Sequence, residues 1–164
     1  MAICLDSATG AVTELSVPRP RSGAVDAGLH FCFEARAHPG VVPLARRCAR
    51  HTLAAWRLGH LMDDAELVIS ELLTNAVQAS LAAPPASGAR TAAPVVALCL
   101  TLDSDLLTVL VGDCRPEPPV RRADPDGDDE AGRGLVIVQA ISDDWGIRPV
   151  AGGGKVVWAR LGLP

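Results

Sequence analysis

The order of the expected elements predicts an α+β fold, a two-layer sandwich in which helices cover a mixed, mainly antiparallel sheet. The sequence indicates strand, helix, helix, hairpin, helix and hairpin, and these hairpins take the place of the repeated βαβ units that build parallel sheets. The 164 residues, 49% of them hydrophobic, suffice to bury one sizeable core. We therefore predict one domain over residues 28–164, preceded by a poorly specified N-terminal arm, residues 1–27, that mixes proline and glycine with few apolar runs.

The domain is expected to begin with a strand over residues 29–35, where hydrophobic and polar side chains alternate as in a half-buried strand. A helix follows over residues 43–58, with Pro43 at a position suited to a first helical turn. Four apolar residues recur in it at helical spacing: Leu44, Cys48, Ala55 and Trp56. Three arginines are interpreted as its solvated face, with a partner-binding patch as the alternative: Arg46, Arg47 and Arg50.

The second helix should span residues 63–80. Asp63 or Asp64 can serve as its N-cap, and Glu66 places negative charge in its first turn, where the helix dipole favours it. Residues 81–94 are rich in proline, alanine and other small residues, which predicts a surface loop between this helix and the strands that follow.

Two hairpins and a third helix make up the rest of the domain. The first hairpin joins strands at residues 95–102 and 106–113 through a short polar turn, and a long loop over residues 114–133 follows. The third helix is expected over residues 132–142. The closing hairpin joins two strands across a glycine turn: residues 145–150, Gly152 to Gly154, and residues 155–161.

Charge and hydropathy exclude two classes of partner. The formal net charge of −4 argues against direct nucleic-acid binding, which normally needs a basic surface. The longest apolar runs fall short of the roughly 18 residues that a membrane span requires, and the first residues lack a basic segment ahead of a long apolar stretch. We therefore expect a cytosolic protein that contacts no membrane.

Neither a metal site nor a disulfide framework is indicated by the cysteines. They are odd in number and form no CxxC pair, so we interpret them as small buried hydrophobic residues: Cys4, Cys32, Cys48, Cys99 and Cys114. Gly154-Lys155 is not part of a phosphate-binding P-loop, because Pro149 stands at the first glycine position and Val156 replaces the Ser or Thr that would hold Mg²⁺.

The second helix carries one polar stripe on an otherwise apolar segment. Four polar residues fall within an arc of about 100° at ~3.6 residues per turn: Glu71, Thr74, Asn75 and Gln78. A carboxylate and an amide one turn apart can supply a proton acceptor or water-positioning group and an oxygen ligand for Mg²⁺. The spacing alone also fits an ordinary amphipathic helix.

Several segments in the same order resemble the motifs of the GHKL ATPases, also called histidine-kinase-like ATPases. Glu71-Leu72-Leu73-Thr74-Asn75-Ala76 resembles their N box, Asp113 the aspartate of their first glycine box, and Gly132-Arg133-Gly134-Leu135 their second glycine box. Asp144-Trp145-Gly146 and GGGKVVWARL resemble the closing strands of the anti-sigma-factor branch. The resemblance covers about residues 28–163 and implies a Bergerat-type ATP-binding fold with ATP and Mg²⁺ as cofactors.

The resemblance implies roles for the helix stripe and the strand end. Glu71 would orient or deprotonate an attacking hydroxyl as the catalytic residue, and Asn75 would be the Mg²⁺ ligand. Asp113, at the end of a strand, would accept a hydrogen bond from the adenine amino group. From its position alone, Asp113 is equally a turn aspartate that ends the strand.

The second glycine box is expected to bind phosphates. The backbone at Gly132 and Gly134 can approach a phosphate closely, the exposed amides of a helix N-terminus favour anions, and Arg133 can add a charge-assisted contact. Taken alone, the two glycines also fit a simple turn or cap. Residues 114–133 would form the ATP lid, since long loops in small domains are commonly functional.

The resemblance implies an ATP-binding regulator of the anti-sigma-factor type. It would phosphorylate a serine or threonine of an antagonist protein, sequester a sigma factor, or do both; homodimer formation is left open. The alternative is a catalytically silent, nucleotide-gated protein-binding module. Two departures from the family pattern bear on this choice: the first box reads Asp113-Cys114-Arg115-Pro116 without its usual glycines, and Gln78-Ala79-Ser80 lacks the basic residue that often follows the N box.

Overall fold

The computed structural model describes residues 28–82, 94–117, 133–150 and 153–163, the side chain of Arg133 excepted, and the backbone of two short strands in the N-terminal arm. Those strands, β1 (Ile3–Leu5) and β2 (Val12–Glu14), pair antiparallel with each other. The loop predicted at 81–94 and the lid predicted at 114–133 lie for the most part outside the described residues.

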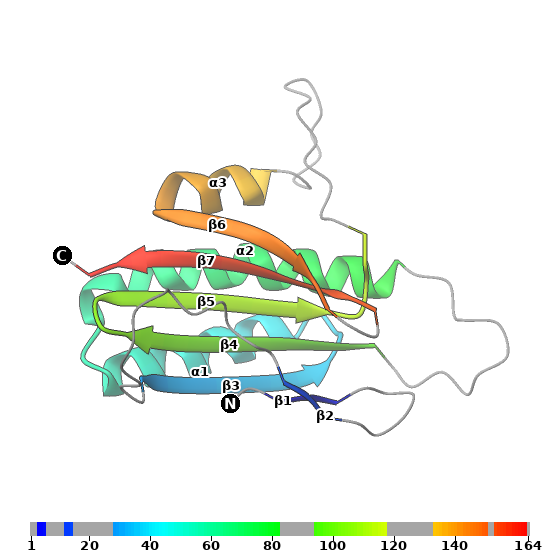
Figure 1. Ribbon diagram of the computed structural model, residues 1–164, viewed down its shortest axis with the longest axis horizontal. Coiled ribbons are helices and arrows are strands. Elements are labelled where there is room, and N and C mark those ends of the chain that lie inside the picture. Colours follow the sequence, from blue (N-terminus) through cyan, green and yellow to red (C-terminus); the bar gives the residue numbers. More distant parts are fainter. Residues whose placement is uncertain are drawn as a thin grey trace, which may run out of the picture.

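Five strands form the main sheet, in the order β3-β4-β5-β7-β6. Each described pair of neighbours in it is antiparallel, and in the view of Figure 1 α1 and α2 lie behind the sheet, with α3 beside its β6 edge. The strands are β3 (Leu29–Arg36), β4 (Val95–Asp103), β5 (Leu106–Asp113), β6 (Asp144–Pro149) and β7 (Lys155–Gly162). The helices are α1 (Val41–Ala55), α2 (Met62–Leu81) and α3 (Arg133–Ile141), with a 3-10 turn at Gly59–Leu61. The predicted α+β class and the helix-on-sheet arrangement are confirmed.

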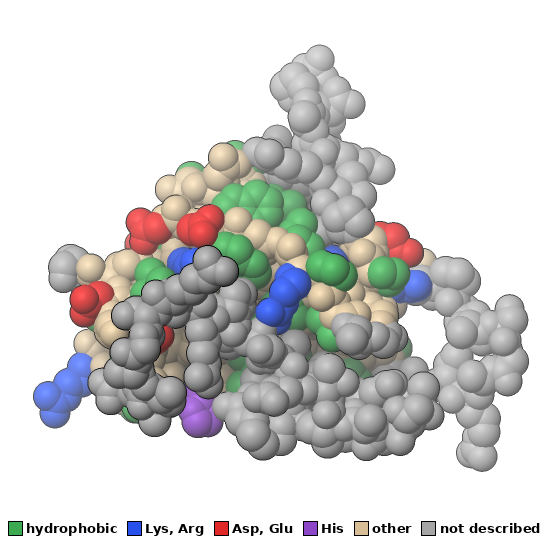
Figure 2. All heavy atoms as spheres, in the orientation of Figure 1, with side chains coloured by type: hydrophobic (Ala, Val, Ile, Leu, Met, Phe, Trp, Pro, Cys, Tyr) green, Lys and Arg blue, Asp and Glu red, His purple; other side chains and the backbone are tan. Residues whose placement is uncertain are grey.

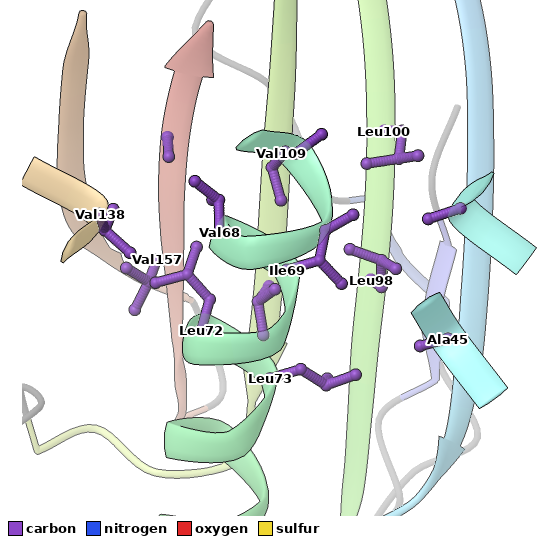
Figure 3. Packing of buried hydrophobic residues seen from close by; sticks show 14 of the residues in the cluster. Ala45, Val68, Ile69, Leu72, Leu73, Leu98, Leu100, Val109, Val138 and Val157 are labelled. Carbon is purple, nitrogen blue, oxygen red and sulfur yellow. The ribbon is translucent and has the colours of Figure 1, made fainter. Parts of the chain in front are cut away.

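The core lies between α2 and the inner face of the sheet. Because side chains alternate along a strand, every second residue of β4, β5 and β7 faces the helices. Figure 3 shows the α2 side chains among these strand residues. The labelled members of this cluster on α2 and the three strands are Val68, Ile69, Leu72, Leu73, Leu98, Leu100, Val109 and Val157. Each fully buried aliphatic side chain stabilises the fold by about 1.5–3 kcal/mol, so α2 and its polar stripe are held firmly against the sheet.

The predicted apolar face of the first helix was wrong in part. Leu44 is 48% exposed and Ala55 is exposed, whereas Trp56 does pack against the core. The buried stripe runs at a spacing of four residues: Val41, Ala45, Ala49 and Leu53. The helix begins at Val41 instead of Pro43, and the small alanines let it lie close to its neighbours, so burial follows this stripe and not the larger Leu44.

The N-cap expected for the second helix was also wrong. The 3-10 turn runs directly into α2, whose N-cap is Leu61 and has no side-chain capping hydrogen bond. Asp63 and Asp64 lie in the first turn instead, where their charge still favours the helix dipole. Glu66 forms ion pairs with Arg46 and Arg50 of α1, so two of the three arginines bind the neighbouring helix.

The cysteines depart from the prediction that they are small buried residues. Of the four whose side chains are described, Cys99 is buried, Cys48 is intermediate, and Cys32 and Cys114 are exposed. Among the described helices, none has the length and apolar character needed to cross a membrane.

Candidate functional site

A buried ion pair joins the ends of two neighbouring strands. Asp113 ends β5 and Lys155 begins β7, and the strand register places them directly opposite each other. Their side chains are 2% and 3% exposed, and Lys155 Nζ donates a hydrogen bond to Asp113 Oδ1 at 2.9 Å. Both residues have the parity of the strand positions that face the helices, so the pair lies on the helix-covered side of the sheet.

The residues after β5 complete this arrangement. The backbone N–H of Arg115 donates to the same Asp113 oxygen at 2.8 Å, and Lys155 Nζ also donates to the Arg115 carbonyl at 3.2 Å. Within the part of the chain that the structure describes, both hydrogen bonds to the carboxylate use Oδ1. A carboxylate oriented in this way presents its second oxygen as an acceptor, which is what recognition of an amino group requires.

Burial dominates the electrostatics of Asp113. It raises the pKa of the carboxyl above its ordinary value, although the hydrogen bond from Lys155 and the Arg115 N–H act in the opposite direction. A buried charged pair is costly to desolvate and costlier still to leave half-paired. Asp113 is therefore held in place by Lys155, and the two side chains act as one unit.

Gly154 makes the approach of β7 to Asp113 sterically feasible. Its φ is +100°, in the left-handed region, and a Cβ on it would overlap the backbone carbonyl oxygen of Asp113. Gly153 has a φ of +99°, and a Cβ on it would meet no atom within 4 Å. The glycine turn thus has one position that needs glycine for its conformation alone and one that needs it also for close packing.

Lys155 is the site residue that the sequence analysis missed. It was rejected as part of a P-loop and placed at the start of the last strand, without being assigned a role in the site. One signal in the sequence pointed to it: it is the only lysine of the chain. The pairing of β5 with β7 joins residues far apart in the sequence, and without that register the partner of Asp113 cannot be identified.

A second contact joins the N box to the second glycine box. Glu71, half-buried on α2, lies so close to Gly134 that a Cβ on this glycine would overlap Glu71 Oε2 and approach Glu71 Cδ to 3.4 Å. Gly134 is buried in the first turn of α3. The structure therefore brings together two residues that the sequence analysis selected from motifs about sixty residues apart, and the absence of a side chain at Gly134 makes the contact possible.

The rest of the polar stripe follows the prediction. Asn75 and Thr74 are half-buried and Gln78 is exposed, while the opposite side of α2 is buried. Asn75 lies one turn after Glu71 toward the C-terminal end of the helix. Figure 1 shows this end of α2 on the same side of the molecule as the end of β5. The stripe thus runs from the Glu71–Gly134 contact toward the side on which Asp113 lies.

The second glycine box is described only in part. Gly132 lies outside the described residues, and Arg133 is the first residue of α3, with its side chain outside them. The start of α3 agrees with the predicted helix N-terminus, whose unpaired backbone amides favour anions.

The donor set fits an adenine nucleotide with a metal held largely by phosphate. The buried Asp113 carboxylate suits an amino group, and Gly134, which carries no side chain, lets the Glu71 carboxylate approach the start of α3 closely. Among the described residues, no group of three His, Cys, Asp or Glu side chains is placed to hold a metal. Mg²⁺ commonly takes one or two protein oxygens beside phosphate and water, and the Asn75 amide can supply one.

The comparisons agree with this geometry. The chain matches the family model of the histidine kinase-like ATPase domain over residues 35–161, a span that contains both the Asp113–Lys155 pair and the Glu71–Gly134 contact. The chain therefore belongs to the histidine kinase-like ATPase domain family, and this membership implies nucleotide binding. No curated protein matches the chain at a significant level.

Proposed function

We propose that this chain is an ATP-binding regulator of the anti-sigma-factor type. It phosphorylates a serine or threonine of an antagonist protein, sequesters a sigma factor, or does both. The observation that carries the proposal is the contact between Glu71 and Gly134. It sets a carboxylate that can serve as a base beside the helix start expected to receive phosphate, on a chain of the histidine kinase-like ATPase family.

At one end of the site, Asp113 would recognise adenine. Lys155 and the Arg115 N–H hold its carboxylate through Oδ1, and the other carboxylate oxygen would accept a hydrogen bond from the exocyclic amino group. Guanine presents a carbonyl in place of that amino group, so the buried acceptor selects against it.

At the other end, the residues around α3 receive the phosphates. The backbone amides of the helix start at Arg133 and Gly134 would bind anionic oxygens, and the Asn75 amide would supply an oxygen ligand to Mg²⁺. Bound ATP would supply the phosphoryl group to be transferred. Glu71 then orients the hydroxyl of the partner and takes its proton, a contribution of roughly 10²–10⁴ in rate for a positioned base.

A catalytically silent, nucleotide-gated binding module is the second candidate, and one observation favours it. The N box is followed by Gln78-Ala79-Ser80, and the only lysine of the chain is engaged by Asp113. Therefore the segment after the N box has no lysine to compensate the phosphate charge, and Lys155 is already paired with Asp113. In this version ATP controls protein docking by differential binding to two conformations.

Transfer of labelled phosphate to candidate antagonist proteins separates the two functions, provided that ATP binding and partner binding are measured in the same samples. Glu71→Gln should retain both kinds of binding and reduce transfer by a factor of roughly 10² or more. Glu66→Gln is the matched control, because it removes a carboxylate from the same helix that pairs with α1 instead. If the parent protein binds ATP and a partner but transfers no label, the kinase function is wrong and the binding module stands.

A further inference from the structure

Two cysteines lie directly opposite each other on neighbouring strands. Cys32 of β3 and Cys99 of β4 are register partners in an antiparallel pair. Residues opposed in this way have Cα atoms about 4.5–5.5 Å apart, which lies within the range of about 4.4–6.8 Å found across disulfides. Bond formation between these two residues therefore needs side-chain rotation and no shift of either strand.

The pair lies on the face of the sheet that points away from the helices. Phe31 and Phe33, on either side of Cys32, pack against the helix-covered core, whereas Cys99 clusters with Leu110 and Val156 on the opposite face. Figure 2 views the molecule from this side, with hydrophobic side chains gathered among charged ones. The cysteine pair is thus separated from the Asp113–Lys155 and Glu71–Gly134 contacts by the thickness of the sheet.

The two cysteines differ in solvent exposure, as expected for a reactive thiol and the resolving thiol beside it. Cys32 is exposed, so a small solute can reach its sulfur. Cys99, directly opposite Cys32 on the neighbouring strand β4, is only 3% exposed. Cys48 and Cys114 lie on α1 and after β5, so neither shares this strand pair.

The surroundings favour the thiolate form of Cys32. A hydrogen bond from the Cys99 side chain lowers the pKa of Cys32 from 9.0 to about 7, against the opposing effect of partial burial. Two residues away on the same face, β3 places His30 and Glu34, and β4 places the uncharged Thr101 and Ala97 opposite them. Because the thiolate is the nucleophile, Cys32 is reactive near neutral pH.

We propose that Cys32 and Cys99 form a redox-modification site that a hydroperoxide closes into a cross-strand disulfide. The Cys32 thiolate attacks the terminal peroxide oxygen and breaks the O–O bond, which gives a sulfenic acid and an alkoxide (hydroxide, if the oxidant is hydrogen peroxide) that takes up a proton. The Cys99 thiol then displaces the sulfenic hydroxyl as water and forms the S–S bond. In sum, two thiols lose two electrons and two protons to the peroxide, and a dithiol reductant reverses the reaction by exchange.

Peroxide treatment of the reduced full-length chain tests the site. Mass spectrometry should find a loss of about 2 Da, and peptide mapping without reductant should find a Cys32–Cys99 crosslink. The crosslink should also form in a Cys48→Ser/Cys114→Ser variant and disappear on treatment with a dithiol. Failure of the crosslink to form in the folded parent, or its replacement by a crosslink to another cysteine, overturns the proposal.

Two single variants test the separate roles of the thiols. Cys99→Ala should leave Cys32 as a sulfenic acid that a dimedone probe traps, and should move the midpoint of its alkylation from about pH 7 toward 9.0 because the hydrogen bond is lost. Cys32→Ser should abolish both the crosslink and the dimedone adduct. An unchanged alkylation midpoint in Cys99→Ala, or an adduct that persists in Cys32→Ser, contradicts these roles.

Discussion

The two ends of the candidate site are built by different means. At the end proposed to bind adenine, called the adenine end below, Asp113 and Lys155 are almost fully buried and charge-paired, and the register of β5 with β7 places them. At the end proposed to bind phosphate, called the phosphate end below, Glu71 is half-buried and meets Gly134 through close packing between α2 and α3. The first end depends on a complementary charge and the second on a missing side chain. Substitutions should therefore affect stability most at the adenine end and geometry most at the phosphate end.

The largest effect is expected on breaking the buried ion pair. Lys155→Met leaves the Asp113 carboxylate buried without its partner, which costs about 3–5 kcal/mol in the free energy of unfolding. Urea denaturation followed by circular dichroism measures this. The double variant Asp113→Asn/Lys155→Met should recover much of the loss, because no buried charge remains. A Lys155→Met protein as stable as the parent would show that the pair does not hold this end together.

The glycine turn provides a matched pair of positions. Gly153→Ala and Gly154→Ala each place an alanine at a φ near +100°, at a strain cost of about 1–3 kcal/mol. Gly154→Ala should cost at least about 1 kcal/mol more, because its Cβ also overlaps the Asp113 carbonyl. Equal melting temperatures of the two variants would contradict the close approach of β7 to Asp113.

At the phosphate end the expected loss of stability is smaller. Gly134→Ala forces the Glu71 carboxylate to move, at about 1–3 kcal/mol for an overpacked contact. Because the overlap is mainly with the end of a flexible side chain, adding Glu71→Ala should restore most of the stability. Denaturation of the two single variants and the double variant gives the coupling energy. Strictly additive losses would mean that the two residues do not touch.

The smallest effect is a pH dependence that belongs to Asp113. Burial raises the pKa of this carboxyl above its value in the unfolded chain. In the pH range between these two pKa values, the folded protein therefore binds the proton more tightly than the unfolded chain does. The stability gained from the group is present below the unfolded pKa and is lost as the pH rises through the folded pKa. The unfolding free energy of the parent minus that of Asp113→Asn should therefore fall as the pH rises through this acidic range. A difference that rises with pH in this range would contradict a raised pKa of Asp113.

Much of the fold was predictable because its elements carry local signals. Alternation marked β3, the polar turn marked the β4–β5 hairpin, and the predicted strand at residues 106–113 agrees with β5 residue for residue. The stripe of α1 was not predictable in the same way. The helix could bury either the face that contains Leu44 or the face that contains Ala45. The choice depends on the neighbouring elements against which the helix packs, and the sequence of the helix alone does not determine it.

The candidate site shows the same division. Glu71, Asn75, Asp113 and Gly134 were identified from motif resemblance and helical spacing, but the resemblance could not reveal that Glu71 touches Gly134. Lys155, and the pairing of Cys32 with Cys99, depend on strand register across long stretches of sequence. Chemistry-bearing residues can thus be selected from sequence, whereas their partners are set by tertiary structure.

Calorimetric titration of ATP into the parent and into Asp113→Asn/Lys155→Met tests the central claim most directly. The double variant avoids a lone buried charge, and circular dichroism verifies that it is folded. If Asp113 binds adenine, replacing its charged acceptor should weaken ATP binding at least several fold, since a hydrogen bond to a charged group contributes roughly 1.5–3 kcal/mol. Equal ATP affinity in the two folded proteins would contradict the assignment of Asp113 to the nucleotide site.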